Sequence, residues 1–310
     1  MGHEPVLAAE VVDHLLPALE QGGTFVDATL GRAGHARLIL EAAPQAHLIG
    51  IDRDAAALEA SRAYLAAQED RFVLVRDDFK NLAAVLERLG HPPLRGVLLD
   101  LGVSSPQLDE ADRGFSYRHN GPLDMRMDTS QPFSAADVVN GYSEAQLERV
   151  IRTFGEERFA RRIARRIVAA RPIEGTAELA DIVKEAIPAA TRRTGGHPAK
   201  RTFQALRLEV NGELDALTKV LPVALDALEA GGRMAVLSYH SLEDRRVKRF
   251  FQDEARGCVC PPDFPVCTCG AKARVRLITR RGVVASDEEI ERNPRAKSAR
   301  LRVAERVMAA

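Results

Sequence analysis

The sequence predicts a doubly wound α/β fold, a Rossmann-like sheet, with an all-helical domain inserted into it. Short apolar runs alternate with helical stretches over residues 1–100, the alternation stops from about Gln107 to Gly196, and it resumes near Lys200. Strands that read as continuous apolar runs are typical of parallel sheets buried on both faces, and helices between them provide the two covering layers.

Each strand of the predicted sheet is short and ends close to a turn. Helices separate the strands in the first part, including an Ala-rich one over 54–67, and the last two strands read as a terminal hairpin pair. The expected strands lie at residues 24–28, 47–52, 72–75, 96–100, 233–238, 274–279 and 301–304.

The inserted region contains helical patterns only. Apolar residues recur at mostly three- to five-residue spacing over 143–170, and a second helix is expected over 176–186 with Thr176 as its cap. Further helices over 200–228 and 241–254 belong to the resumed α/β pattern. We therefore expect residues 1–108 and 197–310 to form one domain and residues 109–196 to form the helical insertion.

Charge is distributed unevenly along the 310 residues. Lys+Arg and Asp+Glu both number 44, but residues 1–100 carry a net −6, residues 101–200 a net +1 and residues 201–310 a net +5. An acidic first part and a basic last part suit a protein that binds a small molecule with one part and a polyanion with another, with chance variation as the alternative.

The sequence favours a cytoplasmic protein without a membrane partner. No uncharged apolar run approaches the ~18 residues of a membrane span. The first 19 residues carry Glu4, Glu10 and Asp13 where a secretory signal would be basic.

The turn after the first strand indicates a nucleoside-binding site. Residues 27–35 place glycines between the first strand and the first helix of the sheet, where backbone N–H groups face a ligand closely. Asp52 closes the second strand 21 residues after Gly31, at the place where an acidic residue binds ribose hydroxyls. The full three-glycine fingerprint of dinucleotide sites is missing. S-adenosylmethionine is therefore favoured over an NAD-type cofactor, with Phe79 after the third strand facing the adenine.

Several long motifs then resemble one family. Asp100 to Asp109 follows the fourth strand and leads into Arg113 to Ser116 and Gly121 to Asp128. These strings are similar to those of the MraW (RsmH) family of bacterial 16S rRNA cytosine-N4 methyltransferases. The resemblance extends over nearly the whole chain, through residues 3–7, 142–166, 197–207, 238–245 and 293–298.

The resemblance implies a methyltransferase-type sheet and an enzyme that methylates the exocyclic N4 of one cytidine in the decoding region of 16S rRNA. It implies S-adenosylmethionine as cofactor and the small ribosomal subunit as partner. It carries cofactor contacts onto Ala33, Gly34, His35, Asp52, Phe79, Asp100 and Gln107. Ala33 stands where some relatives would have glycine, a change that backbone contacts tolerate.

Asp100 is the candidate catalytic residue, as acceptor or orienter of the amine, beside a purely cofactor-binding role. DNA amino-methyltransferases often carry an Asp/Asn-Pro-Pro-aromatic turn here, and this chain has the acid without the aromatic. Phe115, Tyr117, Phe203 or Tyr239 are the alternatives for stacking on the base. His240 is expected to position RNA or to cap a helix rather than to act as a base.

The cysteines speak against carbon-5 methylation and against a metal site. Activation of carbon 5 normally needs a thiolate near the cofactor, and the turns 102–107 and 239–244 contain no cysteine. All four cysteines lie at 258–269, in pairs separated by one residue where zinc ribbons favour two. We expect no metal, with a tetrathiolate zinc site as the alternative.

Two basic stretches are candidates for contact with RNA phosphates, with solvated faces as the alternative. One is the helical run Arg158, Arg161, Arg162, Arg165 and Arg166. The other is Arg292, Arg295, Lys297, Arg300 and Arg302. The rival functions are a non-catalytic ribosome-assembly factor with a methyltransferase fold and an NAD-type oxidoreductase. A homodimer is compatible with the sequence.

Overall fold

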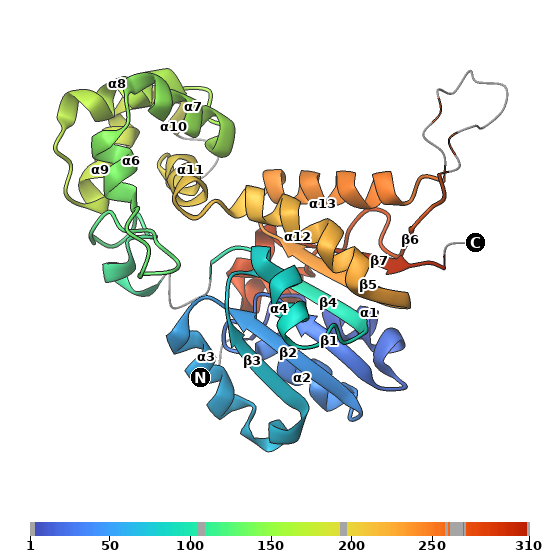
Figure 1. The fold of residues 1–310 in the computed structure, drawn as a ribbon. Coiled ribbons are helices and arrows are strands. Elements are labelled where there is room, and N and C mark those ends of the chain that lie inside the picture. The colour runs from blue at the N-terminus through green and yellow to red at the C-terminus, as the bar shows by residue number, and fades with distance from the viewer. Residues whose placement is uncertain are drawn as a thin grey trace. The chain divides into compact units, whose positions relative to one another are not determined.

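The computed structural model describes residues 4–103, 109–192, 197–257, 260, 269 and 271–308. The chain divides into two compact units (Figure 1). Unit 1 comprises residues 1–102 and 215–310, and unit 2 comprises residues 103–214. No helix within the described residues is long and apolar enough to cross a membrane.

Unit 1 is built on a seven-stranded sheet with the order β3-β2-β1-β4-β5-β7-β6 (Figure 1). β1 to β5 run parallel, and β7 is antiparallel to both β5 and β6. All seven predicted strands are present, and the last two pair as expected. The strands are β1 (Gly23–Asp27), β2 (Ala46–Asp52), β3 (Phe72–Arg76), β4 (Leu94–Asp100), β5 (Leu228–Ser238), β6 (Val275–Leu277) and β7 (Arg300–Arg306).

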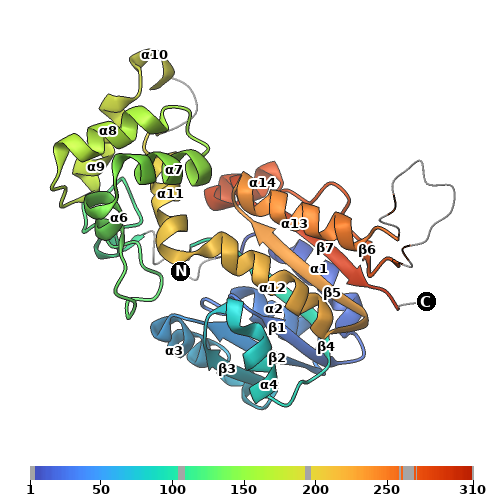
Figure 2. The ribbon, with the colours of Figure 1, turned by 45° about the horizontal axis from the view of Figure 1, so that its top comes forward.

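Helices cover both faces of this sheet (Figure 2). One apolar cluster joins α1 (Ala8–Leu19) and α2 (Gly34–Ala42) to the sheet, with Leu58 of α3 (Ala55–Tyr64) packed against it. The opposite cluster is formed with α4 (Leu82–Arg88), α12 (Glu213–Ala227) and α13 (Ser241–Glu254). The short elements are α14 (Asp287–Arg292) and the 3-10 turns Ala66–Arg71, Phe79–Asn81 and Pro294–Ser298. The doubly wound prediction is confirmed.

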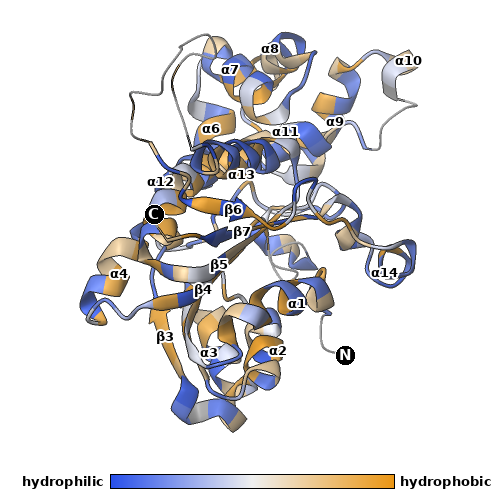
Figure 3. Ribbon diagram, turned by 90° about the vertical axis from the view of Figure 1, so that its right-hand side faces the viewer, coloured by the Kyte–Doolittle hydropathy of each residue, from blue (hydrophilic) through white to orange (hydrophobic). Residues whose placement is uncertain are grey.

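Sequence pattern explains which side of each element is buried. β3 is apolar although it lies at the sheet edge, whereas α13 is mostly hydrophilic (Figure 3). Val247 and Phe251 of α13 are buried, while Arg245, Lys248 and Arg249 are exposed. A narrow apolar stripe therefore attaches this helix to the sheet and leaves its other side basic.

Unit 2 is all-helical, as predicted, with one apolar core of its own. Within the described residues of this unit, β-type pairing is limited to one isolated β-bridge between Pro122 and Gly175. The helices are α6 (Ala135–Gly141), α7 (Glu144–Gly155), α8 (Ala160–Ala170), α9 (Thr176–Ala186), α10 (Ala189–Arg192) and α11 (Lys200–Asn211), with a 3-10 turn at Ala111–Arg113.

Two helices predicted as continuous are each broken in two. The helix expected over 143–170 divides into α7 and α8 because Glu156 is left-handed, with φ 48°. Gly155 before it has no room for a side chain, since a Cβ there would lie 2.7 Å from the Arg201 carbonyl oxygen of α11. The helix expected over 200–228 breaks at Gly212, which has φ 60°.

Two further expectations were wrong in detail. Thr176 does not cap α9: the N-cap is Gly175, and the Thr176 hydroxyl donates to the His119 carbonyl oxygen at 2.9 Å. The second domain boundary lies after Leu214 rather than at 196/197. The reason is that α11 packs on the helical core through Phe203, Leu206 and Val210.

Candidate functional site

The turn after β1 lies over the end of β2. Leu30 N donates to the Ile51 carbonyl oxygen at 3.0 Å, and Gly31 N donates to Asp52 Oδ2 at 2.8 Å. Gly31 and Ala33 have φ of 53° and 60°, so the chain turns sharply before α2. The N-cap residue Ala33 makes no side-chain hydrogen bond to the first turn of α2, and this turn of the helix directly follows the turn after β1.

Asp52 has acceptor capacity to spare at this edge. Its Oδ1 accepts from Asp54 N at 2.9 Å and its Oδ2 accepts from Gly31 N. An ionised carboxylate offers about four lone-pair positions, so two remain for a ligand that donates two hydrogen bonds. Burial raises the pKa of Asp52, and the hydrogen bonds from Asp54 and Gly31 oppose that shift.

Asp100 closes β4 and is held by partners from distant parts of unit 1. Tyr239, directly after β5, donates its hydroxyl to Asp100 Oδ1 at 2.7 Å. His35 of α2 places Nδ1 3.5 Å from Asp100 Oδ2. Asp100 N donates to Thr29 Oγ1 at 2.6 Å, which ties the end of β4 to the turn after β1. The carboxylate therefore lies at the point where the strand order reverses, the ligand position of open α/β sheets.

The orientation of His35 is fixed from behind. Its Nε2 donates to the Val6 carbonyl oxygen at 2.8 Å, because a carbonyl oxygen only accepts. Nδ1 therefore donates to Asp100 only when the ring is charged. His35 is buried, so its contacts with Val6 and Asp100 are shielded from solvent.

Tyr239 is a site residue whose role the sequence did not reveal. The sequence suggests it only as a stacking ring, but its hydroxyl donates to Asp100. Burial and the Asp100 carboxylate raise the pKa of Tyr239 well above 10, so the hydroxyl keeps its proton. Its backbone N–H donates to Glu243 at 2.8 Å, and its ring lies against Gly102, where a Cβ would come within 3.1 Å of it.

Asp27 is the second residue that sequence reasoning passed over. It ends β1, is 2% exposed and accepts from Thr29 N at 3.1 Å. Burial raises the pKa of Asp27 to about 7, and the charges of Asp100 and Asp52 add to the shift. In their ionised forms, the carboxyl groups at these three neighbouring strand ends give the edge a negative potential, which favours a ligand that carries positive charge.

Phe79 lies where the sequence placed it, after β3. Asp77 N donates to the Asp52 carbonyl oxygen at 3.1 Å, which brings the end of β3 beside that of β2. Phe79 is half-buried and packs against the apolar cluster under α4. Asp78 accepts from Lys80 N and begins the short turn that carries the ring. Gln107 lies outside the described residues.

A short N-terminal segment supports the turn from outside. Leu7 N donates to Glu289 Oε1 at 2.7 Å, and Asn293 Nδ2 donates to the Glu4 carbonyl oxygen at 3.2 Å. Pro5 lies against Gly34, where a Cβ would come within 2.7 Å of its ring. Residues 4–7 and Asn293, which resemble the family motifs, thus contact one another and support the turn after β1.

His240 caps a helix, one of the two roles expected for it. It is the N-cap of α13, and its Nδ1 accepts from Glu243 N at 3.4 Å. Glu243 in return accepts from His240 N at 3.2 Å. The pair fixes the start of α13 directly after Tyr239.

The motif at 121–128 forms an ordered loop of unit 2. Arg126 binds Asp124 through two hydrogen bonds of 2.9 and 2.7 Å, and Arg113 Nη2 donates to the Arg126 and Met127 carbonyl oxygens. Asn211 of α11 accepts from Met127 N and donates to the Met125 carbonyl oxygen. Phe115 and Phe203 are buried in the core of this unit, which excludes them as stacking surfaces.

The two basic stretches differ in the structure. Arg161, Arg162 and Arg165 of α8 are exposed, and no ion pair joins them to a described residue. In the second stretch, Arg302 is buried and binds Asp244 at 2.6 and 3.0 Å, and Arg292 lies 3.6 Å from Glu4. The expectation of a second phosphate-binding patch is therefore wrong for Arg302 and weakened for its neighbours.

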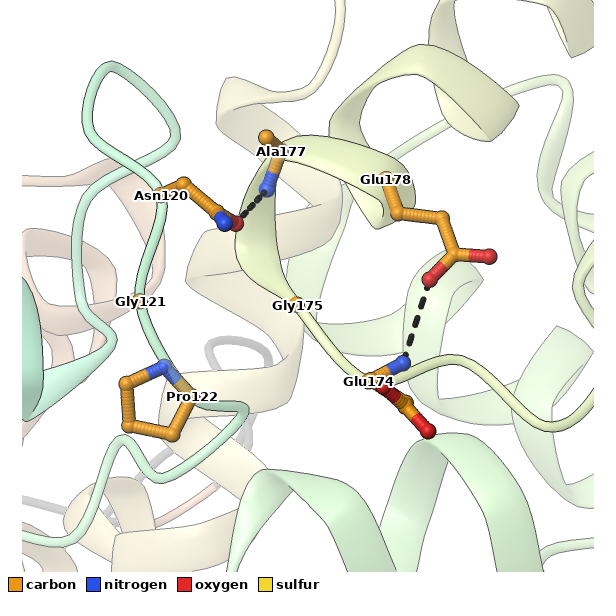
Figure 4. Close-up of a pocket in the computed structure, with 7 residues that line it drawn as sticks. All are labelled: Asn120, Gly121, Pro122, Glu174, Gly175, Ala177 and Glu178. Atoms are coloured by element: carbon orange, nitrogen blue, oxygen red, sulfur yellow. Dashed lines mark hydrogen bonds between the residues drawn. The ribbon is translucent and has the colours of Figure 1, made fainter.

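A shallow depression of about 500 Å³ lies in unit 2 at the start of α9 (Figure 4). Asn120 Oδ1 accepts from Ala177 N at 3.3 Å, and Glu178 accepts from Glu174 N at 3.1 Å. Asn120 therefore satisfies an N–H group in the first turn of α9, and Glu178 satisfies one just before it, so the depression is a junction between a loop and a helix.

Cys258 and Cys267 lie outside the described residues, so the cysteine segment is not seen as a whole. Among the residues that are described, no group of three or more His, Cys, Asp or Glu side chains is arranged to hold a metal ion.

The fold and this edge of the sheet define the class of protein. A doubly wound sheet, a glycine turn and acidic residues at the strand ends are the features of α/β enzymes that bind a nucleoside cofactor. The profile of the MraW methylase family matches residues 1–307, and the chain belongs to this family. It is an S-adenosylmethionine-dependent methyltransferase.

Relatives match over nearly their full length. Ribosomal RNA small subunit methyltransferase H of Heliobacterium modesticaldum is 52% identical, over 98% of this chain and 98% of the relative. The protein of the same name from Geobacter sulfurreducens is 53% identical, over 98% and 99%. A solved rRNA methylase from Streptococcus thermophilus has a TM-score of 0.45 and 12% identity, over 99% of this chain and 100% of that one.

Proposed function

We propose that this methyltransferase transfers a methyl group from S-adenosylmethionine to the exocyclic N4 of a cytidine in the decoding region of small-subunit rRNA. Support comes from relatives at about half identity that are named for the small-subunit RNA. An rRNA substrate implies a cytoplasmic reaction with the small ribosomal subunit as partner.

The residues at the sheet edge fit the cofactor by their chemistry. Asp52 has two unused lone-pair positions for the two ribose hydroxyls. Phe79 offers a half-buried ring for the adenine, and Ala33, Gly34 and His35 bring the uncapped start of α2 toward the methionine part. When ionised, the carboxyl groups of Asp27, Asp52 and Asp100 favour a cationic ligand. The bound cofactor supplies a methyl group on a positively charged sulfur.

Asp100 is assigned to the acceptor amine. A cytosine amino nitrogen is a poor nucleophile because its lone pair is delocalised into the ring, so the site has to orient it and accept its N–H hydrogen bonds. Tyr239 donates to one oxygen of Asp100 and the His35 ring lies 3.5 Å from the other, so contacts from two elements orient the carboxylate at this edge. This network at the reversal of strand order is the observation that carries the proposal.

The rival functions make different predictions. An NAD-type oxidoreductase disagrees with membership in a methylase family. A non-catalytic assembly factor would need no acceptor at Asp100.

The test compares rRNA from a strain that lacks the gene with rRNA after complementation. Mass spectrometry is expected to find N4-methylcytidine restored by the wild type and not by Asp100→Ala. Asp253→Ala, which changes an exposed aspartate on the far end of α13, is the matched control and should restore it. Equal methylation with and without the gene would refute the proposal.

A further inference from the structure

Unit 2 carries a stacked aromatic pair that the proposed reaction does not use. The rings of Tyr117 and His197 have centroids 4.4 Å apart and an interplanar angle of 13°. Tyr117 is half-buried and meets the buried ring of Phe203 edge-on at 5.7 Å. His197 is exposed. The pair is thus anchored in the core at one end and open to solvent at the other.

The exposed ring is held in place. His197 Nδ1 accepts from Ala199 N at 3.2 Å, and the His197 carbonyl oxygen accepts from Lys200 N at 3.0 Å. These bonds fix the residue before the first turn of α11. A solvated surface histidine would have no such restraint, and a ring that is already ordered loses little entropy when a ligand stacks on it.

The start of α11 carries two exposed cations, of which Arg201 also lies 3.8 Å from Glu157 Oε2. Lys200 and Arg201 are exposed in its first turn. Arg201 Nη1 donates to the Glu156 carbonyl oxygen at 3.3 Å, which brings this turn beside the residues that precede α8. Arg158 lies there as well, with its guanidinium 4.6 Å from the centre of the Phe159 ring.

The arginine face of α8 extends this charge. Arg161, Arg162 and Arg165 follow on α8, exposed and without an ion pair to the described residues. α7 packs against both α8 and α11 within this unit (Figure 2). Unit 2 therefore carries both an open aromatic ring and a run of exposed cations, the composition of a surface that binds single-stranded nucleic acid.

We propose that His197, stacked on Tyr117, is a platform for an unpaired nucleobase, with Lys200 and the α8 arginines as contacts for the adjoining phosphates. This platform depends on the proposed function in one point: the single strand that it binds is the rRNA segment around the target cytidine. Every base has a π-face, so the platform accepts a flanking base without reading its identity.

Two variants separate stacking from a structural role. His197→Asn keeps a side-chain acceptor for Ala199 N and loses the ring, whereas His197→Phe keeps the ring and loses the acceptor. His119→Asn is the matched control, since His119 is an exposed histidine of the same unit with no ring contact among the described residues.

The assay is fluorescence anisotropy of the full-length protein with a labelled single-stranded RNA of the decoding-region sequence, at several salt concentrations. His197→Asn is expected to weaken binding roughly five- to 150-fold, the range for loss of one base stack. His197→Phe and His119→Asn should remain within about twofold of the wild type.

The outcomes distinguish this proposal from the reaction. Wild-type affinity in His197→Asn, or equal weakening in His197→Asn and His197→Phe, would overturn the platform while rRNA methylation stands. Ring-dependent RNA binding by a wild-type protein that methylates no rRNA would support the platform and refute the reaction. The platform would also be overturned if a peptide displaced the RNA by binding to the same ring while the variants kept wild-type affinity for the RNA.

Discussion

Replacement of Asp52 by alanine should weaken cofactor binding more than any change that only loosens the turn. The Asp52 carboxylate uses two of about four lone-pair positions on Gly31 N and Asp54 N and leaves two for ribose hydroxyls. Hydrogen bonds to a charged group are worth about 1.5–3 kcal/mol, so Asp52→Ala should raise the dissociation constant roughly ten- to hundredfold.

Because Asp52 also holds Gly31, the control has to disturb the same turn by another route. Ser61 is buried and donates its hydroxyl to the Gly31 carbonyl oxygen at 2.7 Å. Ser61→Ala should lower the free energy of unfolding by about 1 kcal/mol and leave cofactor affinity within about twofold.

Isothermal titration calorimetry with S-adenosylhomocysteine measures both variants, and thermal denaturation verifies that they are folded. Burial raises the pKa of Asp52, so wild-type affinity should weaken on acidification at a higher pH than an exposed aspartate would give. An unchanged dissociation constant in folded Asp52→Ala would remove Asp52 from the site. Equal weakening in Ser61→Ala would assign the effect to the turn.

Three further predictions concern the reaction, the RNA and stability. Tyr239→Phe removes the hydrogen bond to Asp100, so kcat should fall about tenfold with S-adenosylhomocysteine affinity unchanged; an unaltered kcat contradicts the positioning role. Arg161→Ala with Arg165→Ala should lower the slope of log affinity against log salt by roughly 0.7–0.9 per charge, whereas an unchanged slope and affinity would make α8 a solvated face. Burial raises the pKa of Asp27 from 3.8 to about 7. Between these two values the native protein holds a proton that the unfolded chain has lost, so the free energy of unfolding should fall by up to about 4 kcal/mol between pH 4 and 7. Asp27→Asn keeps an oxygen for Thr29 and should flatten that part of the profile in urea titrations; parallel profiles would refute the shift.

The strands and the strand-end acids could be predicted from the sequence because both follow from local pattern and topology. A parallel sheet brings the ends of its strands to one edge, which is why Asp52 and Asp100 could be assigned to one site before any contact was known. The left-handed Glu156 was not foreseen, because a left-handed residue other than glycine leaves little trace in a sequence.

Contacts between distant residues account for the rest of what was missed. Tyr239 lies 139 residues from Asp100, and their hydrogen bond depends on β5 pairing with β4. Arg302 read as a surface cation because its partner Asp244 lies 58 residues away on α13. α11 was assigned to the wrong unit because its apolar face does not say which core it joins.

The central claim is methyl transfer to the N4 nitrogen, and the position of the new methyl group tests it most directly. Small-subunit rRNA that carries tritium on carbon 5 of cytosine would be incubated with the purified protein and S-adenosylmethionine, and its nucleosides separated. The account predicts N4-methylcytidine with full retention of tritium, since the turns 102–107 and 239–244 have no cysteine to activate carbon 5. Release of tritium in step with methylation, with 5-methylcytidine as the product, would contradict it.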